Sequence, residues 1–173
     1  MMDDGGQMHP VEIIPGPDTQ RALRDALGCF ATGVTLITIE STDGPMGFAA
    51  NSFAAVSLDP ALVLWSPAKS SRRFGHYIAA THYAIHVLSR DDFGLLDRFA
   101  RDGAGFAGLA FSRNAEGVPV LDQAVARFEC RQHATHDGGD HMIIVGEVLR
   151  ATHRGGAALV FHQGQYGGFN PLG

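Results

Sequence analysis

Short β-branched and alternating apolar runs recur along the chain, and this pattern predicts a mainly β protein. Several neighbouring runs lack the dozen or more intervening residues that a parallel crossover needs, so we expect antiparallel pairing in a barrel-like sheet. Turns are signalled by STDGP after the first run and by Asp59-Pro60 between the second and third. The expected strands are VTLITIE (34–40), FAAVSL (53–58), ALVLWS (61–66), HYAIHVLS (82–89), VARFECRQH (125–133), HMIIVGEVLRA (141–151) and ALVFHQGQY (158–166).

Three segments instead have the apolar spacing of amphipathic helices. The first follows Asp18, a residue type that caps helix N-termini, and ends at Gly28. The second, SSRRFGHYIAA (70–80), is short, and the third, DDFGLLDRFAR (91–101), has two acidic residues in its first turn. The apolar stripe of the first helix consists of Ala22, Leu23, Ala26 and Leu27, and that of the third consists of Phe93, Leu96 and Phe99 or Ala100.

The order of these elements predicts a mobile N-terminal leader (1–17) followed by a single α+β domain (18–173). Segments 67–81 and 90–124 are expected to cover the open side of the sheet. The leader has no apolar core, so it does not resemble a signal peptide. No apolar run approaches the ~20 residues that span a bilayer, so we expect no membrane association.

The formal net charge is −5 and there is no basic run, which argues against nucleic acid as a partner. The two cysteines, Cys29 and Cys130, lie outside any CxxC spacing, as is typical of a reduced cytoplasmic protein. Each is predicted to be a small buried apolar residue rather than a nucleophile.

Two motifs are rejected on their context. GAGFAG (103–108) matches GxGxxG, and Asp122 lies downstream, but the motif follows a helix and precedes a segment that cannot form one. In HATHDGGDH (133–141) the two glycines indicate a hairpin turn, and no metal-ligand spacing is present, so His133 and His136 are expected to be solvated. The sequence also lacks a GxSxG elbow and a P-loop.

The stretch GFAANSFAAVSLDPALVLW (47–65) places Asn51, Ser52 and Ser57 among small apolar residues. A buried polar group without a partner costs roughly 1–3 kcal/mol, so either the backbone or a ligand must satisfy these side chains. In SPAKSSRRF (66–74), which follows, Ser70 and Ser71 open the second predicted helix beside basic residues. This combination is typical of a phosphate site, although it is also compatible with a plain N-cap.

These segments together resemble the flavin reductase family, the small reductase components of two-component flavin-dependent monooxygenases. The resemblance spans roughly residues 20–167. It is carried in order by 47–65, KSS (69–71), YAIHVLS (83–89), DRFA (97–100), GVPVLDQAVARFECR (117–131) and GDHMIIVGEV (139–148).

The resemblance implies a split β-barrel of the FMN-binding type that dimerises and holds FMN, or FAD, near the subunit interface. His141 and the aromatic Tyr166 would lie beside the nicotinamide of NADH or NADPH, with no metal and no acid–base residue required. The family's flavin-contacting positions match Ala49, Ala50, Asn51, Ser52, Phe53 and Ser57, and its phosphate-contacting positions match Lys69, Ser70 and Ser71.

One position departs from the family pattern, because Ala49 stands where threonine is common, which leaves flavin affinity and the choice between FMN and FAD open. The implied reaction is hydride transfer from a nicotinamide to flavin, which then diffuses as reduced flavin to a partner monooxygenase. The cofactors supply this chemistry and the protein supplies orientation. Two alternatives stay open at this point: an oxidoreductase with FMN as prosthetic group, and a non-catalytic flavin-binding module.

Overall fold

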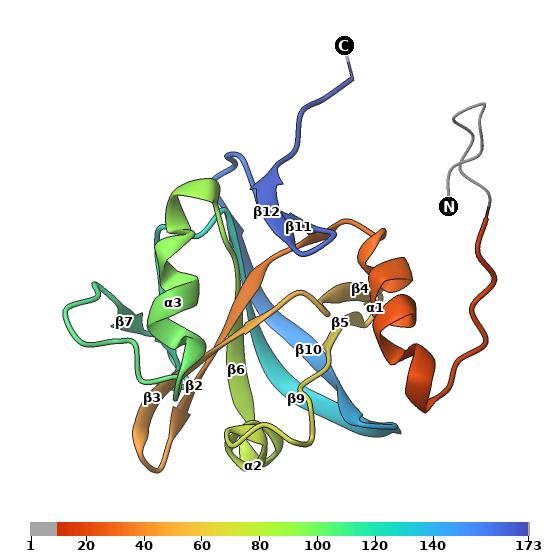
Figure 1. Cartoon of the computed structure of the whole chain (residues 1–173). Coiled ribbons are helices and arrows are strands. Elements are labelled where there is room, and N and C mark those ends of the chain that lie inside the picture. Colours follow the sequence, from red (N-terminus) through yellow and green to blue (C-terminus); the bar gives the residue numbers. More distant parts are fainter. Residues whose placement is uncertain (1–9, 173) are drawn as a thin grey trace.

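The computed structural model describes residues 10–172, and the first nine residues of the predicted leader lie outside this range. A seven-stranded antiparallel sheet dominates the molecule, in the order β3-β2-β6-β9-β10-β5-β4 (Figure 1). Its strands are β2 (Thr35–Ser41), β3 (Gly44–Ala50), β4 (Ala54–Leu58), β5 (Ala61–Trp65), β6 (His82–Val87), β9 (Ala126–Gly138) and β10 (His141–His153).

Two smaller sheets and a few helices complete the fold. The prediction of a mainly β, antiparallel chain is confirmed. Among the described residues the edge strands β3 and β4 do not pair with each other. The remaining elements are η1 (Pro17–Thr19), α1 (Gln20–Gly28), β1 (Thr32–Gly33), α2 (Phe74–Ala79), η2 (Arg90–Asp92), α3 (Gly94–Ala100), β7 (Ser112–Arg113), β8 (Pro119–Val120), β11 (Leu159–His162) and β12 (Gln165–Gly168).

Several local predictions need correction. Strand β3 was not expected, because its sequence GPMGFAA lacks the β-branched residues that signal a strand. The run 158–166 is a hairpin rather than one strand, because Gln163 and Gly164 both have positive φ and turn β11 into β12. Asp18 lies inside η1 instead of capping α1.

The second and third helices also differ from the prediction. Helix α2 begins only at Phe74, so the serines of segment 70–73 do not open it. Helix α3 buries Leu95 and Phe99, whereas Phe93 precedes the helix and is 47% exposed. The apolar stripe is therefore rotated from the expected one, and this rotation leaves Phe93 and Leu96 to line a surface hollow.

Helix α1 forms as expected, but none of its residues is buried. Leu27 is 67% exposed and the nearby Phe30 is 78% exposed. Cys29, at the end of this helix, is exposed, whereas Cys130 is buried as predicted. The prediction for Cys29 was wrong because the stripe of α1 does not pack against the rest of the chain. No helix in residues 10–172 is both long and apolar enough to cross a membrane.

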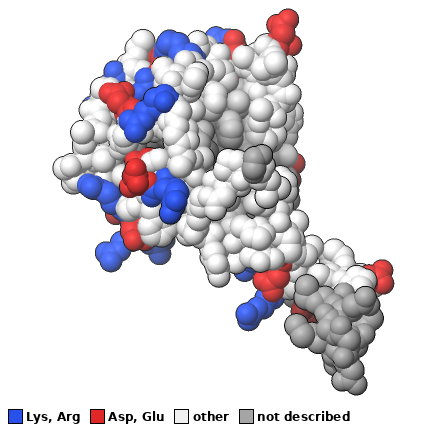
Figure 2. Space-filling view, turned by 90° about the horizontal axis from the view of Figure 1, so that it is seen from above, with Lys and Arg blue, Asp and Glu red and all other residues white. Residues whose placement is uncertain are grey.

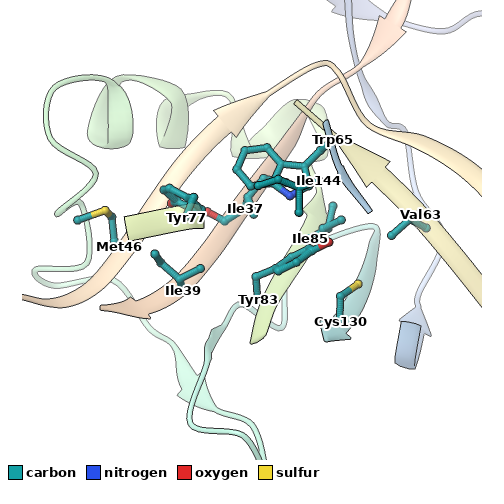
Figure 3. Close-up of a cluster of buried hydrophobic side chains, with 10 residues drawn as sticks. All are labelled: Ile37, Ile39, Met46, Val63, Trp65, Tyr77, Tyr83, Ile85, Cys130 and Ile144. Carbon is teal, nitrogen blue, oxygen red and sulfur yellow. The ribbon is translucent and has the colours of Figure 1, made fainter. Parts of the chain in front are cut away.

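The main core lies between the large sheet and α2 (Figure 3). The ring of Trp65 meets the ring of Tyr77 edge to face, with centroids 5.2 Å apart. The Tyr77 hydroxyl, the one polar group of this buried side chain, donates to the carbonyl of Ile37 at 3.1 Å. Because β2 alternates its side chains, Leu36 joins a second cluster beneath α3 while Ile37 and Ile39 join the first.

A buried histidine ties the centre of the sheet to the loop after β8. His86 on β6 has no exposed surface, and its Nε2 accepts the Leu121 N–H at 3.0 Å. The other ring nitrogen, Nδ1, therefore carries the proton and donates to the Leu36 carbonyl at 3.0 Å. Burial lowers the pKa of His86 to about 4, so the ring is neutral at physiological pH.

Because the folded pKa of His86 lies below the unfolded value, its contribution to stability is complete above about pH 6.5. That contribution is lost as the pH falls towards 4, by up to about 1.4 kcal/mol per pH unit. His86→Leu should lower the free energy of unfolding at pH 7 by about 1–3 kcal/mol, because two buried peptide groups lose their partner. It should also flatten the loss of stability between pH 6.5 and 4.5. Urea unfolding across this range tests both expectations, with the exposed His153→Leu as control; an unchanged pH slope would contradict this role of His86.

Candidate functional site

A hollow of the described surface lies beside Asn51, where β3 ends. It has a volume of about 560 Å³ and is bounded by α1, by Thr32 and by the β11–β12 turn. Two smaller hollows continue it towards α3, and they share Asn51, Ala49 or Tyr166 with their neighbours. We call this continuous depression the Asn51 groove.

The backbone at the Asn51 groove has unused donors. The peptide N–H of Asn51, which lines the groove, and those of Ser52 and Phe53, which follow it in the chain, lie outside any strand and donate to no acceptor in the described part of the chain. The preceding carbonyl, that of Ala50, accepts the hydroxyl of Thr35 at 2.8 Å. The Oγ1 atom of Thr32, which lines the groove, is buried without a partner among the described residues. The groove therefore presents polar groups that a planar ligand with acceptor and donor edges can satisfy.

Ser52 is the polar side chain that the protein itself satisfies. Its hydroxyl accepts the Ser66 N–H at 2.9 Å and donates to the Ser66 carbonyl at 3.3 Å. The Ser52 side chain is therefore satisfied by the backbone, whereas the exposed Asn51 lines the groove.

Ala49 and Tyr166 line the same two hollows of the groove. Ala49 is half-buried and lines two of the three hollows, so a threonine there would place its hydroxyl at the groove wall. Tyr166 on β12 packs against Phe161 and Phe93, with ring centroids 4.9 and 5.2 Å away. These two contacts hold the tyrosine ring at the mouth of the groove.

Lys69, a predicted phosphate residue, and His141, a predicted nicotinamide residue, form a second group at the tip of the β9–β10 hairpin. The Lys69 N–H donates to the Asp140 carbonyl at 2.9 Å, and Ala68 forms a bridge with His141. The Asp140 carboxylate lies 2.7 Å from Nδ1 of His141, and this hydrogen bond lowers the pKa of Asp140. Lys69 and His141 are thus brought together, although 72 positions separate them in the sequence.

The remaining predicted residues have structural surroundings. The Phe53 ring stacks on Phe128 at 5.6 Å and belongs to the main core, so only its backbone is available to a ligand. Ser57 lies on the edge strand β4 and lines none of the hollows of the Asn51 groove. Ser71 accepts the Arg73 N–H at 3.3 Å in a turn, while Ser70 is exposed.

The GAGFAG segment lies in a loop, and its glycines pack closely against β3 and α3. Gly47 on β3 donates its N–H to the Gly103 carbonyl at 2.8 Å. A Cβ atom on Gly105 would lie 2.8 Å from the Arg98 carbonyl, so glycine is needed for the close approach to α3. In the other rejected motif, Gly139 and Asp140 form the β9–β10 turn, and Gly138 pairs with His141. The described residues contain no group of three or more His, Cys, Asp and Glu side chains placed to hold a metal ion.

Several groove residues were not found from the sequence. Thr32, Phe161 and Gln163 line the groove from β1, β11 and the turn that follows it. They come from segments more than 100 positions apart, and no local spacing links them. Arg73 was noted only as a basic neighbour, yet its guanidinium donates to the carbonyls of Gly47 and Phe99 at 2.9 and 2.8 Å.

The fold is that of flavin reductases. Residues 27–170 match the family described as flavin reductase like domain, and the chain belongs to this family. It is 56% identical over 158 residues, 91% of each chain, to the FMN reductase (NADH) SmoA of Agrobacterium fabrum. It is 39% identical to the flavin-dependent monooxygenase reductase subunit HsaB of Rhodococcus jostii, over 87% of this chain and 78% of that one.

A solved structure is similar over nearly the whole chain. This is the NADH:FAD oxidoreductase SgcE6 of Streptomyces globisporus C-1027 in complex with NAD and FAD fragments. The TM-score is 0.84 at 34% identity, covering 93% of this chain and 98% of the other. The family resemblance and the expectation of a mainly β, antiparallel fold are therefore confirmed.

The bond network of Ser52 leads to a prediction about stability. Ser52→Ala removes two hydrogen bonds to the Ser66 backbone and leaves the half-buried N–H of Ser66 unpaired. The free energy of unfolding should therefore fall by about 1–2 kcal/mol. Ser57→Ala is the matched control, because the Ser57 hydroxyl makes no hydrogen bond to the described residues. Urea unfolding of both variants measures the difference, and equal stabilities would contradict the structural role of Ser52.

Proposed function

We propose that this protein is an NAD(P)H:flavin reductase that transfers hydride from the nicotinamide to FMN, or FAD, and supplies reduced flavin to a partner monooxygenase. The observation that carries the proposal is the 56% identity to an FMN reductase that uses NADH, spread over nearly the whole of both chains. The relative HsaB, a monooxygenase reductase subunit, supports the same kind of partner here.

The Asn51 groove fits a flavin ring. The hollow beside Asn51, of about 560 Å³, is within the usual range for small-molecule sites. The free N–H groups of residues 51–53 and the Asn51 amide would bind the polar edge of the ring, with Ala49 and Ala50 against its plane. When bound, the flavin supplies the hydride acceptor, and the chain's part is to orient it and to stabilise the negative charge of the reduced form by these donors.

His141 and Tyr166 would position the nicotinamide. With its Nδ1 proton donated to Asp140, His141 keeps Nε2 as an acceptor, which suits the amide N–H of the nicotinamide. Tyr166 offers a ring face at the groove mouth. Both residues act by orientation, and neither has to move a proton for hydride transfer.

We place the flavin phosphate at Lys69, Ser70 and Ser71. The exposed Ser70 hydroxyl and the Lys69 ammonium are donors of the kind that phosphate prefers. The contact between Ser52 and Ser66 joins this segment to the groove, because Pro67 and Lys69 follow directly after it. The Ser52–Ser66 contact therefore connects the proposed ring site with the proposed phosphate site.

The finer assignments are also proposals: a split β-barrel, a homodimer and a cytoplasmic location. Unpaired Cys29 and Cys130 are in keeping with a reducing compartment. Exposed apolar side chains on α1, with Leu58 on β4 at 96% exposure, favour a second copy of this chain as their cover. In the view from above, charged side chains gather on the side where α3 lies. A broad area beside them is white, which means that it shows no Lys, Arg, Asp or Glu side chain (Figure 2).

The reductase function predicts turnover that saturates in flavin. The purified protein should oxidise NADH or NADPH at a rate that rises with added FMN, FAD or riboflavin and then reaches a plateau. A rate that does not depend on added flavin, with flavin retained through purification, would indicate a prosthetic group instead. Absence of NADH and NADPH oxidation with all three flavins would contradict the proposal and favour a flavin-binding module.

The role of His141 predicts a specific kinetic change. His141→Ala should raise KM for the nicotinamide or lower kcat by about 2- to 10-fold, the size expected for one lost hydrogen bond. KM for flavin should change little. His153→Ala, at the opposite end of β10, serves as control. Kinetics identical to the unmodified protein would remove His141 from the site.

A further inference from the structure

Lys69 is the only lysine in the chain, and its place is fixed by the backbone on both sides. The Met142 N–H donates to the Pro67 carbonyl at 3.1 Å, and the Lys69 N–H donates to the Asp140 carbonyl at 2.9 Å. These bonds hold the 67–69 segment against the tip of the β9–β10 hairpin. The backbone of Lys69 is therefore held beside the hairpin residues.

One of these residues, Asp137, already binds the lysine. Its Oδ2 lies 2.6 Å from Lys69 Nζ, and its Oδ1 accepts the Gly139 N–H at 3.0 Å. The turn thus aims the carboxylate at the ammonium group. The hydrogen bond from Lys69, together with that from Gly139, lowers the pKa of Asp137, so the carboxylate is charged at neutral pH.

The local charge does not favour an anion. Asp140 is the second carboxylate at the hairpin tip, so the formal charges of Lys69, Asp137 and Asp140 sum to −1. A flavin phosphate, with a charge near −2 at neutral pH, must displace Asp137 from the lysine and then remain close to it. The carboxylate is 74% exposed, so it can turn into solvent, but its charge stays near the phosphate.

We propose that Asp137 sets flavin affinity by competing with the flavin phosphate for Lys69. The competition weakens FMN binding and speeds the departure of the reduced flavin. This inference rests on the proposed function, in particular on the phosphate position at Lys69. It assigns an affinity-determining role to a residue that makes no contact with the reacting atoms.

The test compares flavins with and without phosphate. Asp137→Asn keeps an oxygen for the Gly139 N–H and removes the charge, so FMN should bind about two- to fivefold more tightly, the effect of one exposed charge pair. Riboflavin, which has no phosphate, should bind as before. Asp122→Asn is the matched control, because Asp122 is an exposed carboxylate paired with Arg127 at 2.9 Å near the other end of β9.

A second measurement follows the lysine itself. Isotope-labelled lysine gives a side-chain NMR signal from Lys69 alone, and this signal should shift on addition of FMN but not of riboflavin. Lys69→Gln should lose affinity for FMN and keep that for riboflavin, and in this background Asp137→Asn should no longer tighten FMN binding.

The outcomes distinguish a failure of the Asp137 competition from a failure of the proposed reductase function. Tighter FMN binding with unchanged riboflavin binding supports the competition. Unchanged or weaker FMN binding by Asp137→Asn, or an equal change for both flavins, overturns it. NADH oxidation by the unmodified protein, with FMN and with riboflavin, reports on the reductase function independently. Turnover without an effect of Asp137→Asn rejects this inference alone, whereas absence of turnover rejects the proposed function.

Discussion

The two hydrogen bonds between the Ser52 hydroxyl and the backbone of Ser66 hold the candidate site together. They join the end of β3, where Asn51 faces the groove, to the end of β5, where the chain leaves for the hairpin tip. Without this contact the link between β3 and β4 and the segment after β5 would be two separate loops. The half-buried Ser52 hydroxyl thus connects the proposed flavin ring and phosphate positions.

Close backbone packing places the other wall of the groove. A Cβ on Gly47 would lie 2.5 Å from the Phe99 ring, so glycine allows α3 to lie directly on β3. Arg73 then closes this contact, since its guanidinium donates to the carbonyls of both residues. With Phe99 held there, Leu96 is directed to the groove, where it lines the hollows beside Ala49 and Tyr166.

The sequence predicts the elements that depend on local pattern and misses those that depend on distant contacts. Strands such as β2 and β10 are long apolar runs, and they form where expected. Strand β3 is built from glycine, proline and alanine, and it exists because β2 pairs with it along seven residues. The site residues 49–53 and 69–71 were found through the family resemblance. Their division into a groove and a hairpin cluster, and the part played by Thr32, follows only from the folded chain.

Three features of the proposed flavin site would each lower flavin affinity. Ala49 lacks the hydroxyl that a threonine would offer, Asn51 and Tyr166 leave the groove open to solvent, and Asp137 occupies the one lysine. A resident cofactor would be served by the opposite arrangement, with a closed pocket and an unpaired cation. A flavin that must leave after reduction needs binding that is selective in shape but modest in strength. Free backbone N–H groups supply that selectivity, because their positions are fixed by the β3–β4 link and add no formal charge.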